Sequence, residues 1–155
     1  MKKLLLLLLF PLISFSQVTY KDLLSINSLD QFKRVMIEND YDFVEKTETE
    51  TLTYAISPTK NDEGELVSSD FANFHIDSTI FSFSWHESHF GKFRYKVIYD
   101  EVKEKCKFSK ILETEDLDND GKPIDYACYT CPESSVGLIG FTKAYGLGVI
   151  FNVRE

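Results

Sequence analysis

An acidic run near residue 120 is the segment whose residue types and spacing most favour chemistry. It reads Asp116-Leu117-Asp118-Asn119-Asp120-Gly121, so carboxylates fall on alternate residues ahead of a glycine that permits a sharp turn. Calcium prefers six to eight oxygen ligands, and D-x-D-x-D-G loops supply carboxylates in this way. The run predicts a weak calcium site, with candidate ligands Asp116, Asp118, Asp120, Lys122 (through its carbonyl) and Asp125.

The same run has a second interpretation as an acidic hairpin turn. Loop position 12, where an EF-hand has a bidentate glutamate, is occupied by Ala127. Asn119-Asp120-Gly121 is also typical turn composition between strands. Four carboxylates this close together repel one another unless a cation is bound, and this repulsion favours the calcium site. Both interpretations, the calcium site and the acidic turn, stay open.

Three histidines and an acid raise a second hypothesis, a metal-dependent hydrolase. His86 and His89 are three residues apart with Glu87 between them, which misses the His-Glu-x-x-His zinc signature by one residue. His75 would complete a ligand set if the fold brought it near. A surface position for these histidines is the favoured interpretation, and the chain contains no nucleophile elbow, phosphate loop or dinucleotide fingerprint.

The chain has three cysteines, Cys106, Cys128 and Cys131. Cys128 and Cys131 have redox-motif spacing, but they lie among strand-forming residues, where their α-carbons would be about 10 Å apart, beyond disulfide reach. In an oxidising compartment Cys106 should therefore pair with one of them. Three buried reduced cysteines are the alternative.

The N-terminus predicts an export signal. Lys2 and Lys3 precede a short apolar run, and Ser14 and Ser16 provide small residues before a cut that would leave Gln17 first. Residues 1–16 are thus expected to be a signal peptide. The apolar run is too short for a membrane-spanning helix, which needs roughly 20 residues, so no stable membrane anchor is expected after processing.

Charge and length limit the functions of the mature chain. Without residues 1–16, 15 basic and 25 acidic residues are left, a net charge of about −10. Such a charge disfavours nucleic acid and anionic membranes as partners. Residues 17–155 are long enough for one domain with a hydrophobic core, in a secreted or periplasmic location.

Hydrophobic periodicity predicts two helices separated by strands. Ser28-Leu29-Asp30-Gln31 is a capping box for a helix over 29–38, and Tyr95, Ile98, Val102 and Cys106 recur at helical spacing. A shorter helical turn is predicted near 20–24. Extended segments are predicted at 41–50, 52–56, 74–76, 81–85, 110–115, 126–131, 136–143 and 147–153. In the segment 81–85, Phe81, Phe83 and Trp85 form an aromatic row on one face of the strand. We expect this row to belong to the core; the alternative is a partner surface.

These elements predict an α+β fold built from two helix-plus-four-strand repeats, about 17–87 and 88–155, forming an antiparallel sheet with helices packed on one face. Val44–Glu50 aligns with Ile111–Asp116, and Thr53–Ile56 aligns with Asp125–Cys128. The second alignment places Cys128 on the inward face beside Tyr126, so Cys106–Cys128 is the favoured disulfide. Cys131 would then be free or paired between chains.

In its element order the chain resembles beta-lactamase inhibitor protein and its relatives. The resemblance implies one curved antiparallel sheet with helices on one face and a partner protein on the other. The expected function is therefore a small, exported, non-catalytic binding protein that engages another extracytoplasmic protein. The metal-dependent hydrolase and a calcium-stabilised structural protein of the envelope are the alternatives, since fold analogy does not establish function.

Overall fold

The computed structural model describes residues 17–86, 88–117, 123–132, 137–142 and 146–151. Helices and strands follow one another much as the periodicity predicts. In chain order they are α1 Tyr20–Ser25, α2 Leu29–Glu38, β1 Asp42–Lys46, β2 Thr51–Ala55, β3 Thr59–Lys60, β4 Leu66–Val67, β5 Asp70–His75, β6 Ile80–Trp85, α3 His89–Lys105, β7 Lys107–Leu117, β8 Pro123–Thr130, β9 Gly137–Thr142 and β10 Gly146–Phe151.

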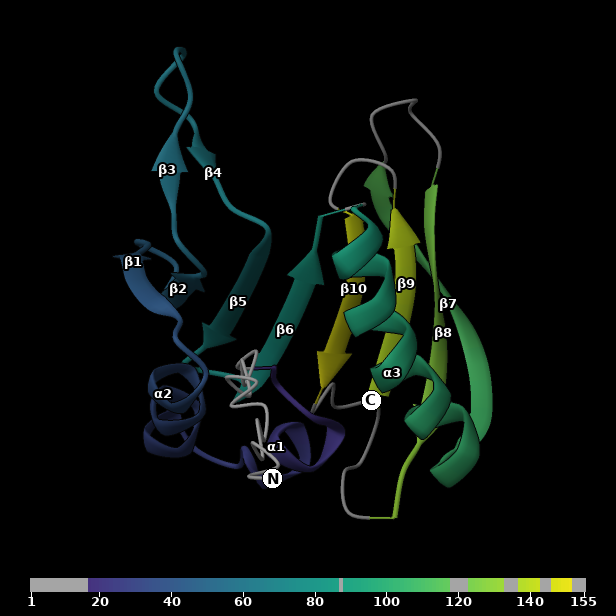
Figure 1. Cartoon of the computed structure of the whole chain (residues 1–155). Helices are drawn as coiled ribbons and strands as arrows, with labels where there is room; N and C mark the ends of the chain where they lie inside the picture. The colour runs from purple at the N-terminus through teal and green to yellow at the C-terminus, as the bar shows by residue number, and fades with distance from the viewer. Residues whose placement is uncertain (1–16, 87, 118–122, 133–136, 143–145, 152–155) are drawn as a thin grey trace, which may run out of the picture.

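The main sheet of the described chain has eight antiparallel strands in the order β1-β2-β5-β6-β10-β9-β8-β7. Each half contributes four sequential neighbours, and the halves join through their last strands, β6 and β10. Strands β3 and β4 form a separate hairpin that extends away from this sheet (Figure 1). The predicted α+β architecture is confirmed, whereas a duplication as its origin is still a prediction.

The described helices lie on one side of the sheet (Figure 1). In α2 the Ser28 hydroxyl accepts from the Gln31 amide, 3.3 Å away, and Phe32, Val35 and Met36 are buried. The Gln31 side chain accepts from the amide of Asn27, one residue before the position that the capping box predicts. No helix among the described residues is long and apolar enough to cross a membrane.

The aromatic row of β6 belongs to the core beneath these helices. Phe81, Phe83 and Trp85 are at most 2 % exposed. Phe32 of α2 packs against the rings of several sheet residues, and Phe81 stacks on Phe151 of β10 at 5.4 Å. The core interpretation of this row is confirmed, and the partner-surface interpretation is wrong for these three residues.

The opposite face of the sheet carries the alternate residues. One row across it runs through Thr53, Asn73, Ser82 and Ile150, which pair in register. These side chains are partly exposed, and no helix of the described chain covers them. Small polar side chains thus dominate the middle of this face.

The disulfide joins Cys106 to Cys131, and the buried Cys128 is not part of it. The predicted Cys106–Cys128 pair is therefore wrong. Successive side chains of a strand point to opposite faces, and Tyr129 and Cys131 face the helices, whereas Cys128 lies in a cluster on the other side. The alignment of Thr53–Ile56 with Asp125–Cys128 assigned the faces of β8 one residue out of step.

Candidate functional site

Two exposed phenylalanines mark the beginning of α3. Phe90 is 69 % exposed and Phe93 is 59 % exposed. The buried side of this helix consists of Gly91, Ile98 and Val102. Phe90 and Phe93 are off this stripe, so the core does not account for them. Single exposed apolar residues are ordinary on protein surfaces, but two large aromatics beside a pocket indicate an interaction site.

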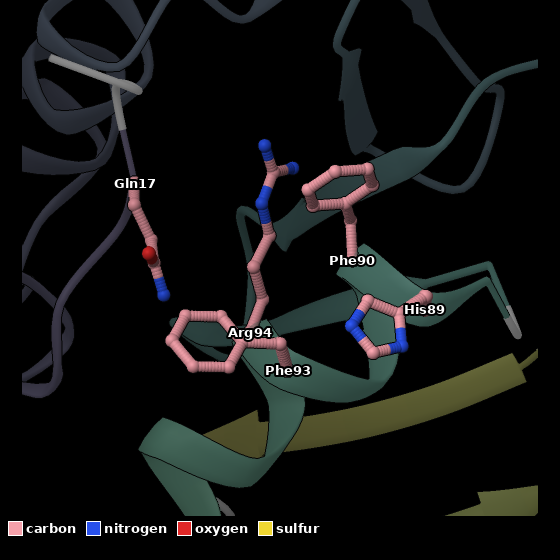
Figure 2. Close-up of a pocket in the computed structure, with 5 residues that line it drawn as sticks. All are labelled: Gln17, His89, Phe90, Phe93 and Arg94. Atoms are coloured by element: carbon pink, nitrogen blue, oxygen red, sulfur yellow. The ribbon is translucent and has the colours of Figure 1, made fainter. Parts of the chain in front are cut away.

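A pocket of about 300 Å³ opens beside these rings (Figure 2). In Figure 2 Arg94 stands between Phe90 and Gln17, and the side chain of Gln17 extends towards the ring of Phe93. This volume is at the lower end of the range for small-molecule sites and accommodates a large side chain of a partner. We call these lining residues the α3 patch: Gln17, His89, Phe90, Phe93 and Arg94.

Arg94 is held in place by a buried carboxylate. Asp70, the first residue of β5, is 1 % exposed, and its Oδ2 accepts from Nη1 of Arg94 and from the hydroxyl of Ser69. The other carboxylate oxygen, Oδ1, has no hydrogen-bond partner among the described residues. A buried carboxylate needs a compensating charge, and the guanidinium supplies it. The pair therefore ties α3 to the first half of the sheet.

A buried tyrosine lies within the electrostatic reach of the same guanidinium. Burial raises the pKa of Tyr41, and the positive charge of Arg94 partly opposes this rise. The Tyr41 ring also packs edge-on against Phe83, with centroids 6.1 Å apart. The ion pair of Arg94 with the buried Asp70 fixes the inner wall of the pocket.

The beginning of α3 is pressed against the end of β6. Ser88 caps the helix by accepting from the amide of Gly91, 3.0 Å away. A Cβ added at Gly91 would lie 2.0 Å from the backbone oxygen of His86, so only glycine fits this approach. Trp85 meets Tyr95 edge-on at 6.3 Å one turn later. The exposed phenylalanines are therefore carried by a rigid support.

The three histidines do not come together. His75 pairs with Ile80 at one end of the β5–β6 ladder, whereas Trp85, just before His86, pairs with Asp70 at the other. Five residues of strand separate these ends by about 17 Å. His75 instead hydrogen-bonds through Nδ1 to the hydroxyl of Thr51 at 2.8 Å. Within the described part of the chain, no three His, Cys, Asp or Glu side chains are grouped to hold a metal.

The predicted calcium loop falls largely outside the described residues, which omit 118–122 and hence Asp118, Asp120 and Lys122. Asp116 lies near the end of β7, and the exposed Asp125 pairs in register with Glu113. The calcium site stays a prediction.

Phe90, Phe93 and Arg94 were not among the sites predicted from the sequence. The signal that could have found them is the helical stripe of Tyr95, Ile98 and Val102, extended backwards to Gly91. Such an extension places two phenylalanines away from the buried side. Comparisons with protein-family models, curated protein sequences and solved structures find no match for this chain.

Proposed function

We propose that this chain is an exported, non-catalytic binding protein that engages another extracytoplasmic protein through the α3 patch. The observation that carries the proposal is the pair of exposed rings, Phe90 and Phe93, at the mouth of a pocket. Burying a phenylalanine at an interface contributes about 1.5–3 kcal/mol, which is typical of the few side chains that dominate binding.

The rigid mounting of the patch supports a role in recognition. The Asp70–Arg94 ion pair and the close approach at Gly91 fix the helix that carries both rings. A surface already held in its bound shape loses less conformational entropy when a partner docks. An extracytoplasmic location is proposed from the N-terminal signal-like segment, and the disulfide is compatible with it.

The uncovered face of the sheet is a second candidate surface within the same function. The resemblance to beta-lactamase inhibitor protein, which rests on element order, implies partner binding on that face. The eight-stranded order and the one-sided helices are consistent with this resemblance. Ser84 lies in the middle of the uncovered face, opposite Gly148 of β10, and is a suitable position to test it.

Site-specific photo-crosslinking distinguishes the two surfaces. We would introduce p-benzoylphenylalanine separately in place of Phe93, Ser84 and Ile37, and irradiate the protein with envelope and supernatant fractions of the producing cells. Ile37 is the matched control, since it is 71 % exposed on α2 and does not line the pocket. The proposal expects one specific protein adduct from position 93 and none from position 37.

A double variant then tests whether the rings serve binding. Phe90→Ser with Phe93→Ser should abolish capture of the crosslinked protein, while Ile37→Ser should not. Because both rings are largely exposed, the double variant should change the free energy of unfolding by no more than about 1 kcal/mol. An adduct from Ser84 alone would move the site to the uncovered face, and identical adducts from all three positions would refute specific binding.

A further inference from the structure

We infer that Gln17 cyclises to pyroglutamate after export and that the resulting uncharged ring forms one wall of the α3 patch. The inference rests on the proposed export, because Gln17 becomes the first residue only if the signal peptide is cut before it. It adds to the proposed function a modified N-terminus that belongs to the binding surface.

The predicted new N-terminus lies at the pocket. Gln17 lines this pocket together with Phe93 and Arg94. Its side chain extends towards the ring of Phe93 (Figure 2), and the residue is partly exposed. The residue that the sequence predicts to be first after cleavage is therefore also a residue of the candidate binding surface.

The chain directly after Gln17 is held in place. Val18 is 4 % exposed and belongs to the core. The amide of Thr19 donates to Oδ2 of Asp22 at 2.8 Å, and the hydroxyl of Thr19 accepts from the amide of Asp22 at 3.2 Å. Moving Gln17 away from the pocket would expose Val18 and break this capping box. The new N-terminus therefore stays at the pocket and is not a free tail.

The surroundings of Gln17 disfavour a charged terminus. A first residue ordinarily carries an α-ammonium group at neutral pH. None of the described residues that line the pocket is acidic, and Asp70 already compensates the guanidinium of Arg94. Partial burial without a counter-ion favours the neutral amine over the ammonium. The neutral amine is the form that can attack a carbonyl carbon.

Cyclisation of Gln17 removes this charge altogether. The neutral α-nitrogen attacks Cδ of the same side chain, and the new bond closes a lactam. The bond between Cδ and Nε2 breaks, and Nε2 leaves as ammonia with the proton that the attacking nitrogen gives up. Both reacting groups belong to one residue, which favours closure, and the step needs no oxidant or cofactor. The product has no terminal charge, so it can lie against Phe93 without a counter-ion.

Mass spectrometry of the exported protein tests the modification. The N-terminal peptide should lack one ammonia relative to its unmodified sequence. Gln17→Asn is the matched control and should keep its full mass, because its ring would be one atom smaller and strained. The rival arrangement is a free ammonium paired with Oδ1 of Asp70, which has no hydrogen-bond partner among the described residues. A full-mass peptide that begins at Gln17 would overturn the inference and leave the proposed function standing.

Nuclear magnetic resonance of exported protein labelled with ¹⁵N-glutamine tests the position of the ring. Gln17 and Gln31 are the two glutamines of the chain. Cyclised protein should therefore show one side-chain amide pair, from Gln31, and one lactam N–H signal. Phe93→Ser should shift the lactam signal, because the neighbouring ring is removed. Ile37→Ser should not shift it, since Ile37 is exposed on α2 and does not line the pocket.

The outcomes separate the modified terminus from the proposed function. A lactam signal that is unchanged in Phe93→Ser, or that shifts equally in both variants, would overturn the placement of the ring in the α3 patch. A lactam signal that shifts only in Phe93→Ser would support the inference even if position 93 crosslinked to no partner. That combination of results would refute the proposed function alone.

Discussion

Removal of the disulfide should measurably destabilise the protein, and the loop that it closes sets the size of the effect. Cys106 and Cys131 are separated by 25 positions in sequence. In the chain-entropy description, a closed loop of this length removes about 12 cal/mol/K from the unfolded chain, or about 3.5 kcal/mol at 25 °C. Cys106→Ser and Cys131→Ser should each lower the free energy of unfolding by about this amount.

Urea unfolding of the oxidised and reduced proteins provides the assay. Reductant should destabilise the wild type by about 3.5 kcal/mol and should have little further effect on either serine variant. Cys128→Ala is the control: the thiol is buried at 2 % exposure, so its truncation should cost about 1 kcal/mol while full sensitivity to reductant is retained. Peptide mapping should join the fragments that contain Cys106 and Cys131.

Three results would refute this reasoning. A peptide map that links Cys106 to Cys128 would contradict the assignment of faces in β8. If reductant no longer destabilised Cys128→Ala but still destabilised Cys131→Ser, the partner of Cys106 would be Cys128 and not Cys131. Three free thiols in exported protein would refute the bridge itself.

The remaining predictions concern the helix support, the acidic loop and maturation. Gly91→Ala should lower the free energy of unfolding in urea by about 1–3 kcal/mol, because the added Cβ would collide with the backbone of His86. Gly148→Ala is the control and should be nearly neutral, since its Cβ would make an ordinary contact at 3.8 Å. Equal effects of the two substitutions would contradict the close approach of α3 to the end of β6. Millimolar calcium should raise the melting temperature, as expected of a ligand that prefers the folded state. The double variant Asp118→Ala with Asp120→Ala should abolish this shift. An identical melting temperature in calcium and in chelator would refute the calcium site and identify the loop as an acidic turn. Mass spectrometry of exported protein should place Gln17 first, and an intact leader would refute the signal peptide.

The sequence predicted most elements because local signals and tertiary packing agree in them. The Ser28 cap and the apolar spacing of Phe32, Val35 and Met36 specify α2 without information from any other segment of the chain. Phe81 and Phe83 alternate with serines in β6, and this period places both rings in the core. Helical period and strand alternation are each sufficient when one face of an element is fully buried.

The facing of β8 could not be predicted in the same way, since large or apolar residues occur on both of its sides. Tyr126 and Cys128 occupy one face, and Ala127 and Tyr129 occupy the other. With no polar alternation to choose between them, the prediction relied on an alignment of four residues to β2. A shift of one residue inverts every side chain of a strand, and the disulfide assignment was inverted with it.

The α3 patch could not be predicted from the sequence because it forms where the first and second halves of the chain meet. We call this contact between the halves the joint. Arg94 belongs to the second half, yet its ionic partner Asp70 belongs to the first. Gln17, from the N-terminal segment, lines the same pocket. A search for motifs within either half finds a basic helix or a lone buried acid and has no reason to join them. The joint is also where β6 passes into α3. A substitution that loosens the joint should therefore disturb stability and the patch together, whereas replacing the exposed rings should disturb the patch alone.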